Sequence, residues 1–144
     1  MTRRNLPDVN VLIALTDPEH QHYSKARDWF LSRREFWGLC PLTEAAYIRI
    51  TTDPAIHPSK RTIEQSIAIL QSLKGHSNHF YWEIKESWVN LTAPFAARIS
   101  GHQQVTDAYL LGLAIKENGV LVTFDRHIKY LAGDEFADNL HFLQ

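Results

Sequence analysis

The stretch Gln104-Val105-Thr106-Asp107-Ala108-Tyr109-Leu110-Leu111-Gly112-Leu113-Ala114 has the spacing of an amphipathic helix. One stripe of this helix is apolar and consists of Val105, Ala108, Leu111 and Ile115. Asp107 falls in the first turn, where the helix dipole favours a negative charge, so capping alone would explain a carboxylate at this position. The places of the other acidic residues indicate a second role.

Three further carboxylates follow the same pattern as Asp107. Asp8, Glu44 and Asp125 each lie where an apolar, strand-like run gives way to a helix-like run. In open α/β folds the carboxyl ends of parallel strands meet at one edge of the sheet, and ligands bind there. We therefore hypothesise that Asp8, Glu44, Asp107 and Asp125 converge on one pocket.

The rest of the chain alternates between strand-like and helix-like segments. Strands are expected at residues 4–8, 36–40, 79–82, 120–124 and 140–143, and helices at 9–15, 20–33, 41–52, 93–100, 105–118 and 127–131. In residues 9–15 the spacing of apolar side chains fits both a helix and a strand, and we assign this segment to a helix that begins at Asp8. A further helix is expected between a cap at Ser59 and an end at Gly75, whereas residues 86–91 are left unassigned. This alternation predicts an α/β fold with a mainly parallel central sheet flanked by helices, formed by residues 1–144 as one domain.

Composition limits the classes of function. The chain has 144 residues and a net charge of −1, which does not indicate a strongly basic nucleic-acid-binding protein. Its single cysteine, Cys40, excludes an internal disulfide framework, and its apolar setting favours a buried, unreactive thiol. No apolar stretch approaches the length of a membrane span. We expect a cytoplasmic protein without membrane contact.

Four carboxylates in one pocket require a compensating charge. Two like charges about 4 Å apart repel by about 4 kcal/mol at an effective dielectric constant of 20, so such a cluster binds a cation or takes up protons. Oxygen ligands select hard cations, and we expect Mg²⁺ or Mn²⁺. A metal-activated water would then hydrolyse a phosphodiester. Side chains that could orient the carboxylates or bound water are Asn10, Thr43, Thr106 and Thr123.

Four segments of the sequence are similar to the acidic motifs of the PIN domain. They are Asp8-Val9-Asn10-Val11-Leu12-Ile13-Ala14-Leu15, Thr43-Glu44, Val105-Thr106-Asp107-Ala108-Tyr109-Leu110 and Thr123-Phe124-Asp125. Their order and the chain length closely resemble the VapC-type toxins of type II toxin–antitoxin systems. The sequence departs from the family pattern after Asp125. Many members have an aromatic residue soon after this position, whereas this chain has Arg126-His127-Ile128.

The resemblance implies a metal-dependent endoribonuclease that acts as a toxin. It implies that Asp8, Glu44, Asp107 and Asp125 bind Mg²⁺ or Mn²⁺, directly or through water. It also implies an RNA substrate, inhibition by a VapB-type antitoxin and homodimerisation.

Several alternatives are weighed against this interpretation. A catalytically silent PIN-like module that only binds a partner is the first, although all four acids are present. A phospho-receiver domain lacks the required lysine at a later strand end, and a Rossmann enzyme lacks a glycine-rich phosphate loop. The tryptophans are assigned to core or interface packing, and His102 to the loop before the Asp107 helix, from which it could reach the mouth of the site.

Overall fold

The computed structural model describes residues 3–56, 61–76 and 78–144. The strands are β1 (Asn5–Pro7), β2 (Val120–Thr123) and β3 (Leu140–Phe142). The α-helices are α1 (Val9–Leu15), α2 (Tyr23–Ser32), α3 (Pro41–Thr51), α4 (Ile63–Lys74), α5 (Trp88–Thr92), α6 (Val105–Lys116) and α7 (Ile128–Ala132). Short 3-10 helices occupy Ala93–Arg98, His102–Gln104 and Ala137–Asn139.

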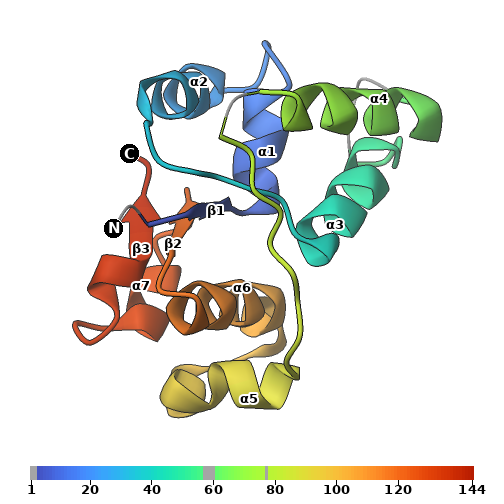
Figure 1. Ribbon diagram of the computed structural model, residues 1–144. Helices are drawn as coiled ribbons and strands as arrows, with labels where there is room; N and C mark the ends of the chain where they lie inside the picture. Colours follow the sequence, from blue (N-terminus) through green and yellow to red (C-terminus); the bar gives the residue numbers. More distant parts are fainter. Residues whose placement is uncertain (1–2, 57–60, 77) are drawn as a thin grey trace.

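The strands form a parallel sheet in the order β1-β2-β3. Leu6 of β1 pairs with Leu121 of β2, which pairs with Leu140 of β3. Neighbouring strands that are distant in sequence thus lie side by side, with all carboxyl ends at one edge of the sheet (Figure 1). The predicted α/β fold with a mainly parallel sheet is confirmed.

Two of the expected strands are reduced to single bridges. Trp37 makes isolated parallel bridges to Asn5 and to His79, so the segments around it continue the sheet beyond β1 without forming strands of their own. The backbone of Asn5 exchanges two hydrogen bonds with this segment, donating to Phe36 and accepting from Gly38. The next donor along β1 on that side would be residue 7, which is a proline without an N–H, so the ladder stops there.

Helices cover both faces of the sheet (Figure 1). The helices α1 to α4 lie on one side, and α5 to α7 lie on the other. Successive residues of β2 point to opposite faces of the sheet. Leu121 packs in the apolar cluster with α6 and α7, and Val122 packs in the cluster with α1 and α2. Both faces are therefore buried, which explains the continuous apolar run of β2.

The helix boundaries follow local capping chemistry. Asp8 caps α1 by accepting a hydrogen bond from the backbone N–H of Val11 at 3.0 Å. Thr62 caps α4 through a reciprocal pair of hydrogen bonds with Gln65. The expected cap Ser59 lies outside the described residues. Of residues 93–100, expected as a short helix, Ala93–Arg98 form a 3-10 helix that contains Pro94.

The tryptophan assignment is largely confirmed. Trp29, Trp37 and Trp82 are buried in the core, whereas Trp88 is half-buried and donates a hydrogen bond to the backbone carbonyl of Val105. Cys40 is fully buried, as expected for an unreactive thiol. None of the helices in the described residues has the length and apolar character needed to span a bilayer.

Candidate metal centre

Asp8 lies between the end of β1 and the start of α1. Its carboxylate is almost completely buried and accepts hydrogen bonds from the N–H of Val11 at 3.0 Å and from the hydroxyl of Thr123 at 2.5 Å. Burial raises the pKa of Asp8 to about 6, assisted by the charge of Asp125 and opposed by these hydrogen bonds. The structure thus holds this carboxyl in an environment that disfavours its charge.

Asp107 lies in the first turn of α6 and is half-buried. Burial, followed by the charges of Asp8 and Asp125, raises the pKa of Asp107 to about 7. Within residues 3–56, 61–76 and 78–144, no donor hydrogen-bonds to its carboxylate and no cation pairs with it. Asp107 therefore lies near two other carboxylates, and its own charge has no compensating group among the described residues.

Asp125 follows β2 and is more accessible than Asp8, with 39% of its side chain exposed. One oxygen of its carboxylate accepts a hydrogen bond from the N–H of His127 at 2.8 Å and lies 3.1 Å from the imidazole Nδ1 of the same residue. Its own N–H donates to the Thr123 hydroxyl at 3.0 Å. Thr123 thus connects Asp125 to Asp8.

A pocket of about 470 Å³ opens at this edge of the sheet. Asp107 and Asp125 line it together with His102 and His127, and its remaining wall comes from residues 100–104, Ile128 and Leu131. His102, assigned from the sequence to the loop before the Asp107 helix, begins a short 3-10 helix and contributes to the lining of this pocket. The pocket is large enough for a small ligand, and both carboxylate and imidazole side chains contribute to its lining.

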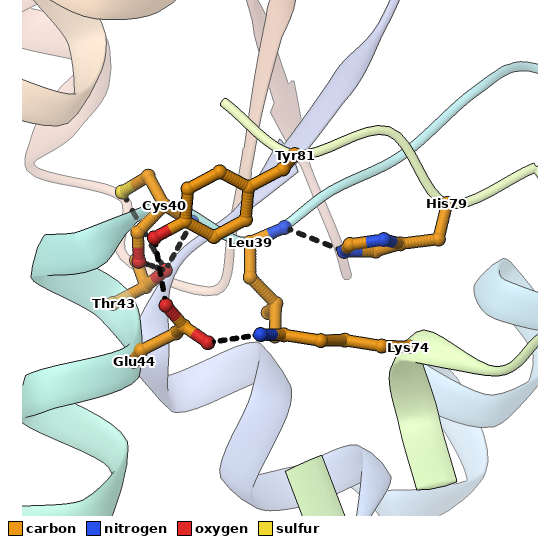
Figure 2. Close-up of polar contacts among 7 residues, drawn as sticks. All are labelled: Leu39, Cys40, Thr43, Glu44, Lys74, His79 and Tyr81. Carbon is orange, nitrogen blue, oxygen red and sulfur yellow. Dashed lines mark hydrogen bonds and ion pairs between the residues drawn. The ribbon is translucent and has the colours of Figure 1, made fainter. Parts of the chain in front are cut away.

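Glu44 occupies a different environment from the three aspartates. It lies in the first turn of α3, with one carboxylate oxygen accepting a hydrogen bond from the Tyr81 hydroxyl at 2.7 Å and the other 2.5 Å from the ammonium of Lys74 (Figure 2). Burial, and then the hydrogen bond to Glu44, raises the pKa of Tyr81 above its usual range. Glu44 is absent from the charges that raise the pKa of Asp8 and Asp107.

The structure therefore brings together Asp8, Asp107 and Asp125, whereas both oxygens of Glu44 already have partners. Lys74 and Tyr81 were not anticipated from the sequence. They lie on α4 and on the segment beside Trp37, about 30 and 37 positions from Glu44, and no local motif connects them.

The residues expected to orient the acids have separate roles. Thr123 contacts Asp8 directly, as expected of a residue that positions a ligand. Thr43 instead completes the cap of α3, because its hydroxyl accepts from the N–H of Cys40 and donates to the carbonyl of the same residue, both at 3.1 Å. The side chains of Asn10 and Thr106 are exposed.

The donor set fits a hard divalent cation. Three carboxylates share one neighbourhood, and Asp107 lacks any partner in the described chain, which is the charge pattern that a cation would neutralise. In the same part of the chain, no three His, Cys, Asp or Glu side chains are gathered closely enough to form a ready coordination shell. Magnesium retains several of its waters in proteins, so it can be held by carboxylates that contact it through water.

Comparisons with known proteins identify the family of this chain. Residues 6–134 match the model of the PIN domain. Ribonuclease VapC38 of Mycobacterium tuberculosis is 38% identical over 128 residues, covering 88% of this chain and 89% of the relative. Ribonuclease VapC44 of the same organism is 35% identical and covers 90% of this chain and 91% of the relative. The chain therefore belongs to the PIN domain family, in which these relatives are VapC ribonucleases.

Solved structures show the same fold at lower sequence identity. The structure of VapBC2 from Rickettsia felis bound to a DNA fragment from its promoter superposes with a TM-score of 0.65 at 13% identity, covering 98% of this chain and 99% of that chain. VapBC-1 from nontypeable Haemophilus influenzae gives a TM-score of 0.58 at 18% identity, covering 98% of this chain and 97% of that chain.

Proposed function

We propose that this protein is a metal-dependent endoribonuclease that acts as the toxin of a VapBC-type toxin–antitoxin pair. The observation that carries the proposal is the group of Asp8, Asp107 and Asp125, in which burial and mutual repulsion raise two of the three pKa values. The names of the relatives, which are VapC ribonucleases, support RNA as the substrate. Residues 1–144 would form one PIN domain.

Each acidic residue has a proposed role in this site. Asp8, Asp107 and Asp125 would hold Mg²⁺ or Mn²⁺, directly or through water, and Glu44 would complete the acidic set from α3. When bound, such an ion supplies Lewis-acid activation of water and of a phosphodiester. Thr123 would fix the orientation of the Asp8 carboxylate, and His127 that of the Asp125 carboxylate. No nucleophilic side chain is required.

The proposed partners follow from the same relationship. The related structures from Rickettsia felis and Haemophilus influenzae are VapBC complexes, which supports a VapB-type antitoxin as the inhibitor of this chain. We also propose a homodimer in the cytoplasm.

Cleavage assays with the complete chain test the proposal. Purified protein should degrade a pool of single-stranded RNA with Mg²⁺ or Mn²⁺, and EDTA should stop the reaction. It should also hydrolyse bis(p-nitrophenyl) phosphate, a small diester that reports on the acidic site without an RNA-binding surface. Asp107→Asn should abolish both activities, whereas Asp28→Asn, an exposed change on α2, should retain them. Absence of both activities in the unmodified protein, with folding verified, would favour a silent partner-binding module.

A further inference from the structure

A second groove lies immediately beyond the acidic pocket, between α7 and the edge strand β3. Its volume is about 880 Å³, larger than that of the acidic pocket. Two cationic side chains, Arg126 and Lys129, line it together with the aromatic rings of Tyr130 and Phe142. No sequence motif connects these residues, because Phe142 is distant in the chain and reaches the groove through the pairing of β3 with β2.

The groove and the acidic pocket share one short segment of chain. Asp125 and His127 line the acidic pocket, whereas Arg126 and Lys129 line the groove, so successive residues alternate between the two surfaces. Consecutive Cα atoms are about 3.8 Å apart, so the groove begins one residue from a proposed metal ligand. Figure 1 shows α7 beside β3.

The charged groups of the groove are held over an aromatic ring. The ammonium of Lys129 lies 4.6 Å, and the guanidinium carbon of Arg126 lies 5.8 Å, from the centroid of Phe142. In the part of the chain that the structure describes, neither cation forms an ion pair with a carboxylate. Asp134 also lines the groove.

Tyr130 offers an apolar surface next to these cations. It is 75% exposed, which is a high exposure for so large a ring. Single-stranded nucleic acids bind where cationic groups follow the backbone and exposed aromatic rings stack on the bases. Arg126, Lys129 and Tyr130 provide both elements within five residues of one another.

We propose that this groove binds single-stranded RNA next to the site of cleavage. Arg126 and Lys129 contact backbone phosphates, and Tyr130 stacks on a base. The inference rests on the proposed ribonuclease function, which it extends by assigning the path of the substrate away from Asp125. The groove positions the strand, and the acidic residues carry out the chemistry.

The salt dependence of RNA binding tests the phosphate contacts. The probe is a fluorescein-labelled random 20-nucleotide RNA, measured by fluorescence anisotropy between 50 and 300 mM KCl with the Asp107→Asn chain, so that the RNA stays intact. Arg126→Gln with Lys129→Gln should weaken binding, and the slope of log K against log salt should become shallower by about 0.7 for each lost contact. Lys25→Gln with Arg27→Gln, which removes two exposed cations from α2, is the matched control and should leave the slope unchanged.

The stacking contact has its own signature. Tyr130→Ala should weaken binding by roughly tenfold without changing the salt slope, because it removes a ring and no charge. Tyr130→Phe retains the ring and should bind as tightly as the parent chain. An equal loss in both Tyr130 variants would contradict stacking.

The outcomes separate this proposal from the proposed function. If the Arg126/Lys129 variant has the same RNA affinity and the same salt slope as the Lys25/Arg27 control, the groove assignment is overturned. This holds even if the unmodified chain hydrolyses bis(p-nitrophenyl) phosphate. If that hydrolysis is absent while RNA binding still depends on the groove, the groove assignment stands and the proposed catalytic function fails. Unchanged RNA binding with loss of an oligomer in size-exclusion chromatography would assign the groove to a second copy of the chain and would also overturn the proposal.

Discussion

The hydroxyl of Thr123 donates a 2.5 Å hydrogen bond to the carboxylate of Asp8, although 115 positions separate the two residues. The same hydroxyl accepts a hydrogen bond from the N–H of Asp125 at 3.0 Å. The parallel pairing of β1 with β2 brings these groups together, because Pro7, the last residue of β1, is paired with Val122, so Asp8 and Thr123 follow side by side at the same edge. A single buried hydroxyl therefore fixes the relative positions of two proposed metal ligands.

Replacing Thr123 with Val tests this connection. The change keeps a similar shape but removes the donor to Asp8, and we expect it to lower the free energy of unfolding by about 1 to 3 kcal/mol, since a buried carboxylate loses a hydrogen-bond partner. The pKa of Asp8 should rise further, because this hydrogen bond opposes the effect of burial. Affinity for Mn²⁺ at pH 7 should then fall, as measured by isothermal titration calorimetry.

Thr123→Ser provides the control, because it retains the hydroxyl. It should keep most of the Mn²⁺ affinity while losing some stability through the missing methyl group. Equal Mn²⁺ affinities for the valine and serine variants would show that the hydrogen bond to Asp8 does not prepare the site for metal.

The stability of the metal-free protein should fall as the pH rises from about 4 to about 7. The pKa values of Asp8 and Asp107, about 6 and about 7, lie above the ordinary 3.8, so the folded protein binds more protons than the unfolded chain in this window. Stability then decreases with pH and levels off above the folded pKa values. Urea unfolding in EDTA should show a decrease on the order of several kcal/mol from these two groups, since each pKa unit corresponds to about 1.4 kcal/mol.

The double variant Asp8→Asn with Asp107→Asn should lose most of this pH dependence. Adding Mg²⁺ should offset the decrease in the unmodified protein at pH 7 to 8, because metal binds the deprotonated carboxylates. A pH dependence that is the same in the double variant would place its origin outside the candidate site.

Asp107→Asn should leave the metal-free protein at least as stable as the unmodified chain at pH 7.5. It removes a charge that burial and two neighbouring carboxylates disfavour, and these costs exceed the stabilisation of about 0.3 to 1 kcal/mol that the helix dipole offers. Mg²⁺ at about a hundred times its Kd should stabilise the unmodified protein by roughly 2.7 kcal/mol, a Tm increase of roughly 5 to 10 °C. The asparagine variant should show a much smaller increase in thermal melts.

Two results would contradict this account of Asp107. The same Tm increase in both proteins would mean that Asp107 is not a ligand. A strongly destabilised metal-free variant would mean that the carboxylate serves mainly to cap α6. Asp28→Asn should behave like the unmodified protein in every condition.

The sequence was most informative where local chemistry alone determines the structure. Residues 9–15 become α1 as expected, because Asp8 caps the helix through the nearby N–H of Val11. The apolar run that becomes β2 is recognisable because both of its faces are buried. In contrast, the segment around Trp37 was expected to be a full strand, and its pairing with β1 ends because Pro7 lacks a donor.

Sequence patterns predicted some non-local contacts and missed others. The proximity of Asp8, Asp107 and Asp125 could be expected, since each lies at a boundary between a strand-like and a helix-like run. The environment of Glu44 could not be expected, because Lys74 and Tyr81 approach it through the packing of α4 and of the irregular segment beside Trp37. The sequence placed Glu44 at the correct kind of position but carried no information about its partners.

The contacts of Glu44 predict that it contributes less to metal binding than Asp107 does. Its negative charge is already compensated by Lys74, and its other oxygen is engaged by Tyr81 (Figure 2). Glu44→Gln should therefore lower Mn²⁺ affinity by less than roughly tenfold. Asp107→Asn should lower it by more than roughly 100-fold, which is the largest loss typical of removing an outer partner of a metal ligand.

Lys74→Met leaves the charge of Glu44 without compensation, so this variant should bind Mn²⁺ more tightly, and adding Glu44→Gln should cancel the gain. Isothermal titration calorimetry on the four combinations of these two substitutions measures the coupling directly. If Glu44→Gln is as damaging as Asp107→Asn, Glu44 must leave Lys74 to bind the ion, and the ion pair seen here belongs to the metal-free state alone.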